Sequence, residues 1–381
     1  MPFQFRVRPL GSVVPAVAVS MLAVSALALA AAAPALAQPA ASTAQPAAST
    51  GWRVVKTFPK NTNLDTIVPL PGKTAWAGGE TPGQLPAVYH LAHGKWQRTT
   101  LPGSMGTFVN QISATSSTNV WASLANTPAV EHLTRKGWVA HTFAIGADEI
   151  LLGGVVTFSP KDTFVFAFDF ATKKNYSYHY NGTKWIRKSM PAGLDANSDN
   201  GLVSGTSYGN IWGLTIVGGN YAALWFNGHK WRIEKFPAHL AASGSTAFAR
   251  QILAVSRKSV WVPIFVSSAT SVGPVVLLHW NGKKWNKMGG KAPKAALSGA
   301  VATDGTGGVW LAANNTAFTK PLLMHYAHGT WSERAAPTPG GQILDITALT
   351  GVPGTRSVMG TAAINPTFGG NSGSVILKYG K

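Results

Sequence analysis

The stretch Tyr178-His179-Tyr180-Asn181-Gly182-Thr183-Lys184-Trp185 decides the fold, because the chain contains this pattern seven times. In each copy a short apolar run ends in His or an aromatic residue, a turn follows, and Trp opens the next run. Turn residues such as Asn and Gly between two apolar runs predict a β-hairpin. Five further complete copies occupy residues 90–96, 132–138, 225–231, 279–285 and 325–331. The seventh copy is split, with its first half at residues 377–381 and its second half at residues 51–55.

The spacing of these hairpins predicts a β-propeller. From one hairpin Trp to the next the interval is 42 to 54 residues, a length typical of a propeller blade of four strands. Within each interval a second apolar strand, such as the one around Val120-Trp121, follows a turn, and a strand of small residues precedes that turn. Each period therefore supplies strands A (small residues, innermost), B, C (ending at the repeated His) and D (opening with Trp, outermost).

The split copy predicts how the ring closes. Residues 52–59 would form strand D of the last blade, whose strands A, B and C come from residues 341–380. Such closure joins the two ends and leaves no open face between blades. We therefore predict an all-β fold over residues 51–381, a seven-bladed β-propeller of four-stranded blades closed by the N-terminal strand. All 14 Trp fall on repeat positions, which predicts that they pack between neighbouring blades.

The order of a B strand followed by an aromatic-turn-Trp hairpin resembles kelch and Asp-box propeller repeats, as found in many secreted bacterial proteins. The Gly-Gly pair typical of kelch strand B occurs at Gly78-Gly79, whereas turns such as Tyr180-Asn181-Gly182 replace the Asp of an Asp-box. Some kelch relatives imply copper radical chemistry, but its Cys-linked tyrosine cannot form in a chain without Cys. Asp-box relatives imply sialidase chemistry, and its three arginines are not found at corresponding positions. The resemblance therefore implies a fold and no reaction.

The N-terminal segment predicts export. Arg6 and Arg8 precede an apolar run over residues 13–33, and Ala35-Leu36-Ala37 has the form of a signal-peptidase site. We predict a signal peptide over residues 1–37, with an uncleaved membrane anchor as the competing interpretation. After cleavage we expect no transmembrane segment and a secreted or extracellular protein, either released or held at the cell surface.

Residues 38–50 are rich in Ala, Pro, Ser and Thr and belong to two copies of Ala-Gln-Pro-Ala-Ala-Ser-Thr. Such a composition cannot bury a core, so we predict a spacer. Removing Arg6 and Arg8 lowers the net charge from +19 to +17. A charge of this size attracts anionic partners. We therefore expect a monomer that binds an anionic or carbohydrate polymer. Nucleic acid ranks lower, because Trp residues packed between blades leave few aromatic surfaces for bases.

Cations beside the hairpin Trp are the candidate binding residues. We assign this role to Lys95, Lys136, Lys184, Lys230, Lys283 and Lys284, and we add Arg250, near the propeller axis, as a further binding candidate. Their repetition predicts a basic girdle for a polyanion. The alternative is that these cations protect the exposed edge of each sheet, because Lys and Arg on a D strand block edge-to-edge pairing with another sheet. The repeated histidines His90, His132, His179, His279 and His325 lie on separate blades. We predict a packing or hydrogen-bonding role for them, because histidines so placed cannot share a metal ion.

Carboxylates at the propeller axis are the weak catalytic candidates. Asp65 and Asp345 begin strand A of two blades that closure makes neighbours, with Arg250 at a related position, and Asp148 and Glu149 occupy a connection on the same side. Two carboxylates and an arginine would suit glycoside cleavage or cation binding. The alternative is that these polar residues only bind channel water.

The segment containing Asp195, Asn197 and Asp199 resembles the first half of a calcium loop, and calcium is the one cofactor that we consider. An ordinary Asx-rich connection would explain the same residues. For the whole protein, the first hypothesis is a secreted non-catalytic binding protein for a polymer of the cell envelope or extracellular matrix. A polysaccharide hydrolase or lyase acting on the loop face is the second hypothesis, and a protein-interaction scaffold is the third.

Overall fold

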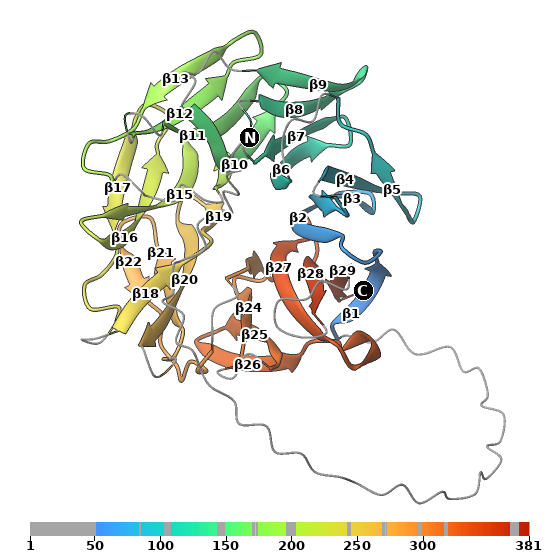
Figure 1. The fold of residues 1–381 in the computed structure, drawn as a ribbon. Coiled ribbons are helices and arrows are strands. Elements are labelled where there is room, and N and C mark those ends of the chain that lie inside the picture. Colours follow the sequence, from blue (N-terminus) through green and yellow to red (C-terminus); the bar gives the residue numbers. More distant parts are fainter. Residues whose placement is uncertain are drawn as a thin grey trace, which may run out of the picture. The chain divides into compact units, whose positions relative to one another are not determined.

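The computed structural model describes residues 51–380, apart from residues 84, 103–107, 126, 128, 143–148, 170–171, 173, 196–202, 242–244, 269–270, 272, 296–298, 316–318 and 366–372. Its strands form seven antiparallel sheets, and Figure 1 shows these sheets following one another around a ring. This arrangement confirms the predicted all-β, seven-bladed propeller. Within the described part of the chain, no helix combines the length and apolar character needed to cross a bilayer.

The first four blades follow the predicted A-B-C-D order. Blade 1 contains β2 (Asn63–Leu70), β3 (Thr74–Thr81), β4 (Leu85–Ala92) and β5 (Lys95–Thr99). Blade 2 contains β6 (Val109–Ser116), β7 (Asn119–Leu124), β8 (Ala129–Thr134) and β9 (Gly137–Thr142). Blade 3 contains β10 (Glu149–Ser159), β11 (Asp162–Asp169), β12 (Lys174–Tyr180) and β13 (Trp185–Ser189). Blade 4 contains β14 (Ser204–Ser207), β15 (Asn210–Val217), β16 (Asn220–Phe226) and β17 (Trp231–Lys235).

Blade 5 differs in having two segments at the innermost position. These segments are β18 (Ser245–Ala249) and β19 (Leu253–Ser256), which both pair with β20 (Ser259–Ser268), followed by β21 (Val276–Trp280) and β22 (Trp285–Lys287). Blade 6 contains β23 (Val301–Thr303), β24 (Val309–Asn314), β25 (Pro321–Ala327) and β26 (Thr330–Ala335). After the short 3-10 helix η1 (Pro339–Gly341), blade 7 contains β27 (Ile343–Gly351), β28 (Val358–Asn365) and β29 (Ser374–Tyr379).

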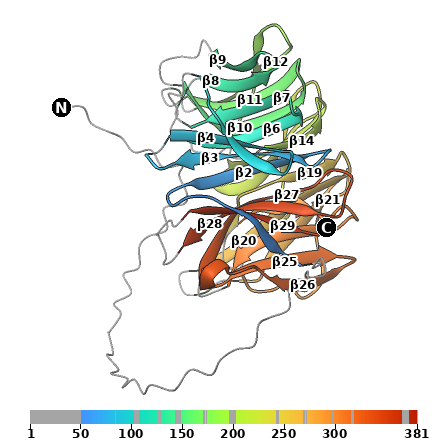
Figure 2. The ribbon, with the colours of Figure 1, turned by 90° about the vertical axis from the view of Figure 1, so that its right-hand side faces the viewer.

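The N-terminal strand closes the ring. Strand β1 (Arg53–Thr57) pairs antiparallel with β29 and completes blade 7, with Arg53 opposite Lys378 and Thr57 opposite Val375. In Figure 1 the blue strand β1 lies beside the red strand β29, and Figure 2 shows the red strands of blade 7 next to the blue strands of blade 1. The predicted three-plus-one closure is therefore confirmed.

The repeated His is part of the packing within the five blades that carry it. Strands B and C place it directly opposite the B-strand aromatic residue, as in the pairs Trp76 with His90 and Trp121 with His132. The rings of these pairs stack with centroids 4.0 Å and 3.8 Å apart. Burial lowers the pKa of His132 to about 4, with a smaller contribution from His141, so the stacked imidazole is neutral. The structure thus gives these histidines the predicted packing role.

A second ring contact joins five of the blades to the preceding blade. The D-strand Trp of one blade meets the B-strand aromatic residue of the preceding blade edge to face, as Trp185 does with Trp121 at 5.7 Å and 87°. Trp52 of β1 makes the same contact with Trp310 of blade 6 at 5.4 Å and 87°. Edge-to-face pairs of this kind are favourable beyond the apolar area that they bury.

Hydrogen bonds tie the innermost strands of neighbouring blades together. The hydroxyl oxygens of Thr66 and Ser204 accept bonds from backbone N–H groups of the next blade, at 3.2 Å and 2.9 Å. Gln111 accepts from the Val155 N–H at 3.2 Å and donates to the Val203 carbonyl at 2.9 Å, so that it spans three blades. Backbone groups at the free edge of strand A are thereby satisfied without water.

We expect Trp52→Ala to lower the free energy of unfolding by about 3–5 kcal/mol, the cost of emptying a buried aromatic site. Trp52 is buried between Trp310 and Tyr379, so the change opens a cavity at the closure of the ring. Chemical denaturation followed by circular dichroism measures the effect. Val55→Ala is the control on the same strand, because Val55 is 43% exposed. Equal losses in the two variants would contradict a closure that depends on the Trp52 contact.

Candidate functional site

The six candidate lysines all belong to the turns between strands C and D. They are exposed and form no ion pair with any described residue: Lys95, Lys136, Lys184, Lys230, Lys283 and Lys284. Two ion pairs among the described residues join His179 to Asp162 and His325 to Asp304. The positive charge of the C–D turns is therefore available to an external anion.

Three adjacent blades build this turn in the same way. In blade 3 the side-chain oxygen of Asn181 accepts bonds from the N–H groups of Thr183 and Lys184, at 3.0 Å and 2.9 Å. The side-chain oxygens of Asn227 and Asn281 accept the corresponding two N–H bonds in the turns of blades 4 and 5. A Gly with φ between 91° and 97° follows each of the three Asn residues. Only Gly adopts this conformation without strain. Blades 3, 4 and 5 therefore present Lys184, Lys230 and Lys284 from one fixed backbone geometry.

The A–B turns add cations that the sequence analysis missed. In a meander of four strands, the A–B and C–D turns lie at the same end of the blade, and the A–B turns carry Lys73, Lys161, Arg257, Lys258 and Arg356. The stem of Lys161 covers Gly182, where an added Cβ would lie 2.6 Å from the Lys161 Cγ. Lys258 covers Gly282 in the same manner. Both sets of turns therefore form one surface, which we call the basic turn face.

The second candidate region is the beginning of strand β2, where Asp65 occupies a β-bulge. Leu64 pairs with Gly79 and Thr66 with Gly78, so Asp65 is the extra residue in β2. The bulge needs Gly79, because a Cβ there would lie 1.9 Å from the Asn63 carbonyl oxygen. A bulge re-aims the side chain that it carries. The Gly78-Gly79 pair therefore permits the backbone bulge that carries Asp65.

Electrostatics couple the predicted channel residues. Burial raises the pKa of Asp65 to about 7, with further contributions from Glu80 and Asp345, while the Asn63 amide opposes the shift from 3.3 Å. Burial also raises the pKa of Asp345, and Arg250 lowers it. Asp65, Asp345 and Arg250 therefore lie in one electrostatic environment. Glu80 was missed, because only the pairing of β2 with β3 places it opposite Asn63.

The remaining candidates lie partly outside the described residues. Asp148, Asn197 and Asp199 are not described, and neither is the side chain of Glu149, which begins β10. Asp195 is described, and its two carboxylate oxygens accept bonds from the N–H groups of Gly218 and Gly219 at 2.9 Å and 2.8 Å. This carboxylate anchors the B–C turn of blade 4. The described residues contain no group of three His, Asp or Glu side chains arranged to hold a metal ion, and the calcium site stays a prediction.

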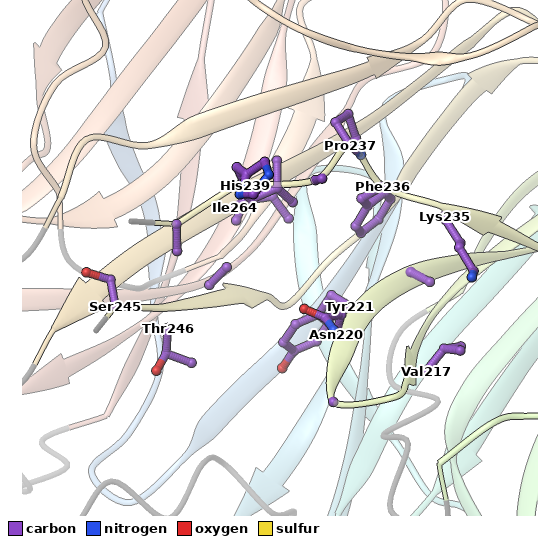
Figure 3. A pocket seen from close by; sticks show the side chains of 16 residues that line it. Val217, Asn220, Tyr221, Lys235, Phe236, Pro237, His239, Ser245, Thr246 and Ile264 are labelled. Atoms are coloured by element: carbon purple, nitrogen blue, oxygen red, sulfur yellow. The ribbon is translucent and has the colours of Figure 1, made fainter. Parts of the chain in front are cut away.

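A groove of about 620 Å³ lies between blades 4 and 5, at the end opposite the basic turn face. Figure 3 shows Asn220 and Tyr221 of β16 on one side and Ser245 and Thr246 of β18 on the other. Phe236, Pro237 and His239 of the connection between β17 and β18 line the groove between them. His239 has φ 59°, a left-handed conformation that is uncommon for a residue other than Gly. The sequence analysis did not single out this groove.

Comparisons with known proteins agree with the fold. No protein-family model matches the chain, and no curated protein is significantly similar to it. Among solved structures, YCF48 from Cyanidioschyzon merolae is 14% identical, with a TM-score of 0.58 and 86% of this chain and 98% of that chain covered. Virginiamycin B lyase from Staphylococcus aureus, in a structure with quinupristin, is 12% identical, with a TM-score of 0.56 and coverages of 86% and 99%. Likenesses at these identities show the propeller fold alone.

We expect Asp65→Asn to stabilise the protein relative to wild type more at pH 8 than at pH 4. The pKa of Asp65 rises from 3.8 to about 7 on folding, so the folded state holds this proton more tightly than the unfolded chain. Its contribution to stability is complete below pH 3.8 and is lost as the pH rises through about 7. Thermal melting at both pH values measures the difference between variant and wild type. Glu333→Gln, at an exposed carboxylate of β26, is the control. A difference that does not change with pH would contradict the raised pKa.

Proposed function

We propose that the protein is a secreted, non-catalytic binding protein for an anionic or carbohydrate polymer of the cell envelope or extracellular matrix. The basic turn face is the binding surface, and the N-terminal segment directs export. The observation that carries this proposal is the repeated Asn-Gly turn, which holds Lys184, Lys230 and Lys284 in the same backbone geometry on three adjacent blades. An edge-protection role requires positive charge on the D strands, and it does not require such fixed turns.

The charge around these lysines favours an anionic ligand. Asp162 and Asp304 are the acidic residues at the described turns of the basic turn face, and each accepts a hydrogen bond from a repeated His, at 2.7 Å and 2.8 Å. Asp304 also accepts bonds from the N–H groups of Thr306 and Gly308. Both carboxylates are therefore engaged within their own blades, and the cations of this face remain to attract a polyanion.

The distribution of the cations favours a polymer over a small anion. Each of blades 3 and 4 contributes one lysine to its C–D turn and blade 5 contributes two, Lys283 and Lys284. A small anion at one turn meets the cations of that turn and its immediate neighbours. A chain of repeating negative charges meets successive blades and releases a counterion at each contact, so its binding gains with length and weakens with salt.

A polysaccharide hydrolase or lyase is the second candidate, and a specific observation favours it. A carboxyl group with a pKa of about 7, as at Asp65, is protonated often enough near neutral pH to act as a general acid. Asp345 would then supply the second carboxyl group; burial raises its pKa, and Arg250 opposes this shift. If this candidate holds, the variant Asp65→Asn with Asp345→Asn loses turnover of a polysaccharide and keeps its affinity for the polymer.

We expect the mature protein to bind heparin at low salt, with an affinity that falls steeply as salt rises. The triple variant Lys184→Gln, Lys230→Gln, Lys284→Gln should flatten the plot of log affinity against log salt by about one unit per lysine. Affinity measurements at several salt concentrations give this slope. The control is Lys174→Gln, Lys291→Gln, Lys320→Gln, which removes the same charge from exposed lysines outside the basic turn face.

Three results separate the possibilities. A protein that is not retained on heparin at low salt contradicts polymer binding. Equal slopes in the two triple variants contradict the basic turn face as the binding surface. Retained binding in Asp65→Asn with Asp345→Asn, together with no turnover by the wild type, separates a binding protein from the enzyme.

A further inference from the structure

The groove between blades 4 and 5 continues along the outer side of these blades. A second, open groove of about 390 Å³ is lined by Lys235, Phe236 and Pro237, which also line the first groove, and by the two turn lysines of blade 5. Trp280 and Trp285 form its base, and both are buried, at 5% and 7% exposed. The two grooves therefore make one track, from the C–D turn of blade 5 to the B–C turn of blade 4.

The track lies where the chain departs from its own repeat. The interval from Trp231 to Trp285 is 54 residues, whereas the other intervals are 42 to 47 residues. The greater length is divided between the segment from Trp231 to Trp261, which contains the connection after β17 and strand β18, and the segment from Trp261 to Trp285, which contains the long strand β20. Strands β18 and β19 pair with different halves of β20 and together take the innermost position, which one strand, β10, takes in blade 3. Strand β18 supplies one wall of the groove through Ser245 and Thr246.

The chemistry of the track changes from one end to the other. At the blade 4 end, the rings of Tyr221 and Phe236 lie beside the hydroxyl and amide groups of Ser245, Thr246 and Asn220. Aromatic faces with a few placed polar groups suit the apolar faces and hydroxyls of a sugar ring. At the blade 5 end, Lys235, Lys283 and Lys284 line the wall, and Glu234 is the acidic residue among them. Burial raises the pKa of Glu234, and Arg232 opposes this shift.

We propose that this track binds one stretch of an acidic polysaccharide, with a sugar ring in the Tyr221 end and its carboxylate, sulfate or phosphate groups on the lysines of blade 5. The inference rests on the proposed polymer-binding function and assigns it a site and a ligand class. Nucleic acid fits less well, because Trp280 and Trp285 are buried in the core and cannot stack with bases. An acidic peptide would use the lysines and would leave Asn220 and Thr246, on the two opposite walls of the groove (Figure 3), without a ligand.

The test compares two double variants of equal charge in the mature protein. Lys283→Gln with Lys284→Gln alters the track, and Lys174→Gln with Lys320→Gln alters two exposed lysines that lie outside the track and outside the basic turn face. We expect the track variant to lose about tenfold or more in affinity for a heparin oligosaccharide, the loss typical of hydrogen bonds to charged groups. The Lys174 and Lys320 variant should lose less than about threefold, as expected for exposed charges that contribute only to the general field.

A second pair of measurements identifies the ligand class. Asn220→Ala with Thr246→Ala, at one exposed position on each wall of the groove (Figure 3), should weaken heparin oligosaccharide binding and leave polyglutamate binding unchanged. Equal losses for the two lysine variants, with wild-type binding intact, would overturn the track and leave polymer binding standing. Equal dependence of polyglutamate on Asn220 and Thr246 would replace the polysaccharide by an acidic peptide. A wild type that binds neither probe would overturn the proposed function itself.

Discussion

The contact between the B-strand aromatic ring and the D-strand Trp of the next blade is the interaction on which the structure depends. Seven apolar clusters of buried residues lie in the described chain, and each combines strands of two neighbouring blades. A blade is only one sheet thick, so it has no core of its own and is stable only against its neighbours. Closing the ring by β1 is therefore necessary, because an open ring would expose two of these apolar faces.

Burial of the repeated rings also determines which polar groups remain for function. The imidazoles of His90, His132 and His279 have lowered pKa values because they are buried, so they stack as neutral rings. His179 and His325 are held by Asp162 and Asp304. The chain contains ten His residues, and the five at the repeat position are part of the packing, so they are not available to a ligand. The residues available to a ligand are those that vary between blades, such as the turn lysines and the channel carboxylates.

Much of the fold could be predicted from the sequence, because the repeat encodes it locally. The Trp spacing defined the blades, and the split copy predicted the pairing of β1 with β29. The turn lysines were also found, since they lie between two recognisable strands. The closeness of Asp65 and Asp345 followed from closure, whereas the place of Glu80 did not, because it depends on the pairing of β2 with β3 around the bulge at Asp65. The A–B turn cations were missed because their approach to the C–D turns, as for Lys161 over Gly182, is a tertiary contact.

The groove between blades 4 and 5 indicates a ligand site more directly than the repeated hairpin does. A residue that recurs in every blade is fully explained by the requirement to pack seven sheets in a ring, and its presence says little about a ligand. The interval from Trp231 to Trp285 is the longest between successive hairpin Trp residues, and the innermost strand of blade 5 is divided into β18 and β19, whereas β10 of blade 3 is one strand. The connection before β18 holds His239 in a left-handed conformation, a local cost that the surrounding structure must offset. Packing seven equivalent blades in a ring does not require these departures. They shape the surface beside Tyr221 and Phe236, and we therefore place the ligand-specific function there.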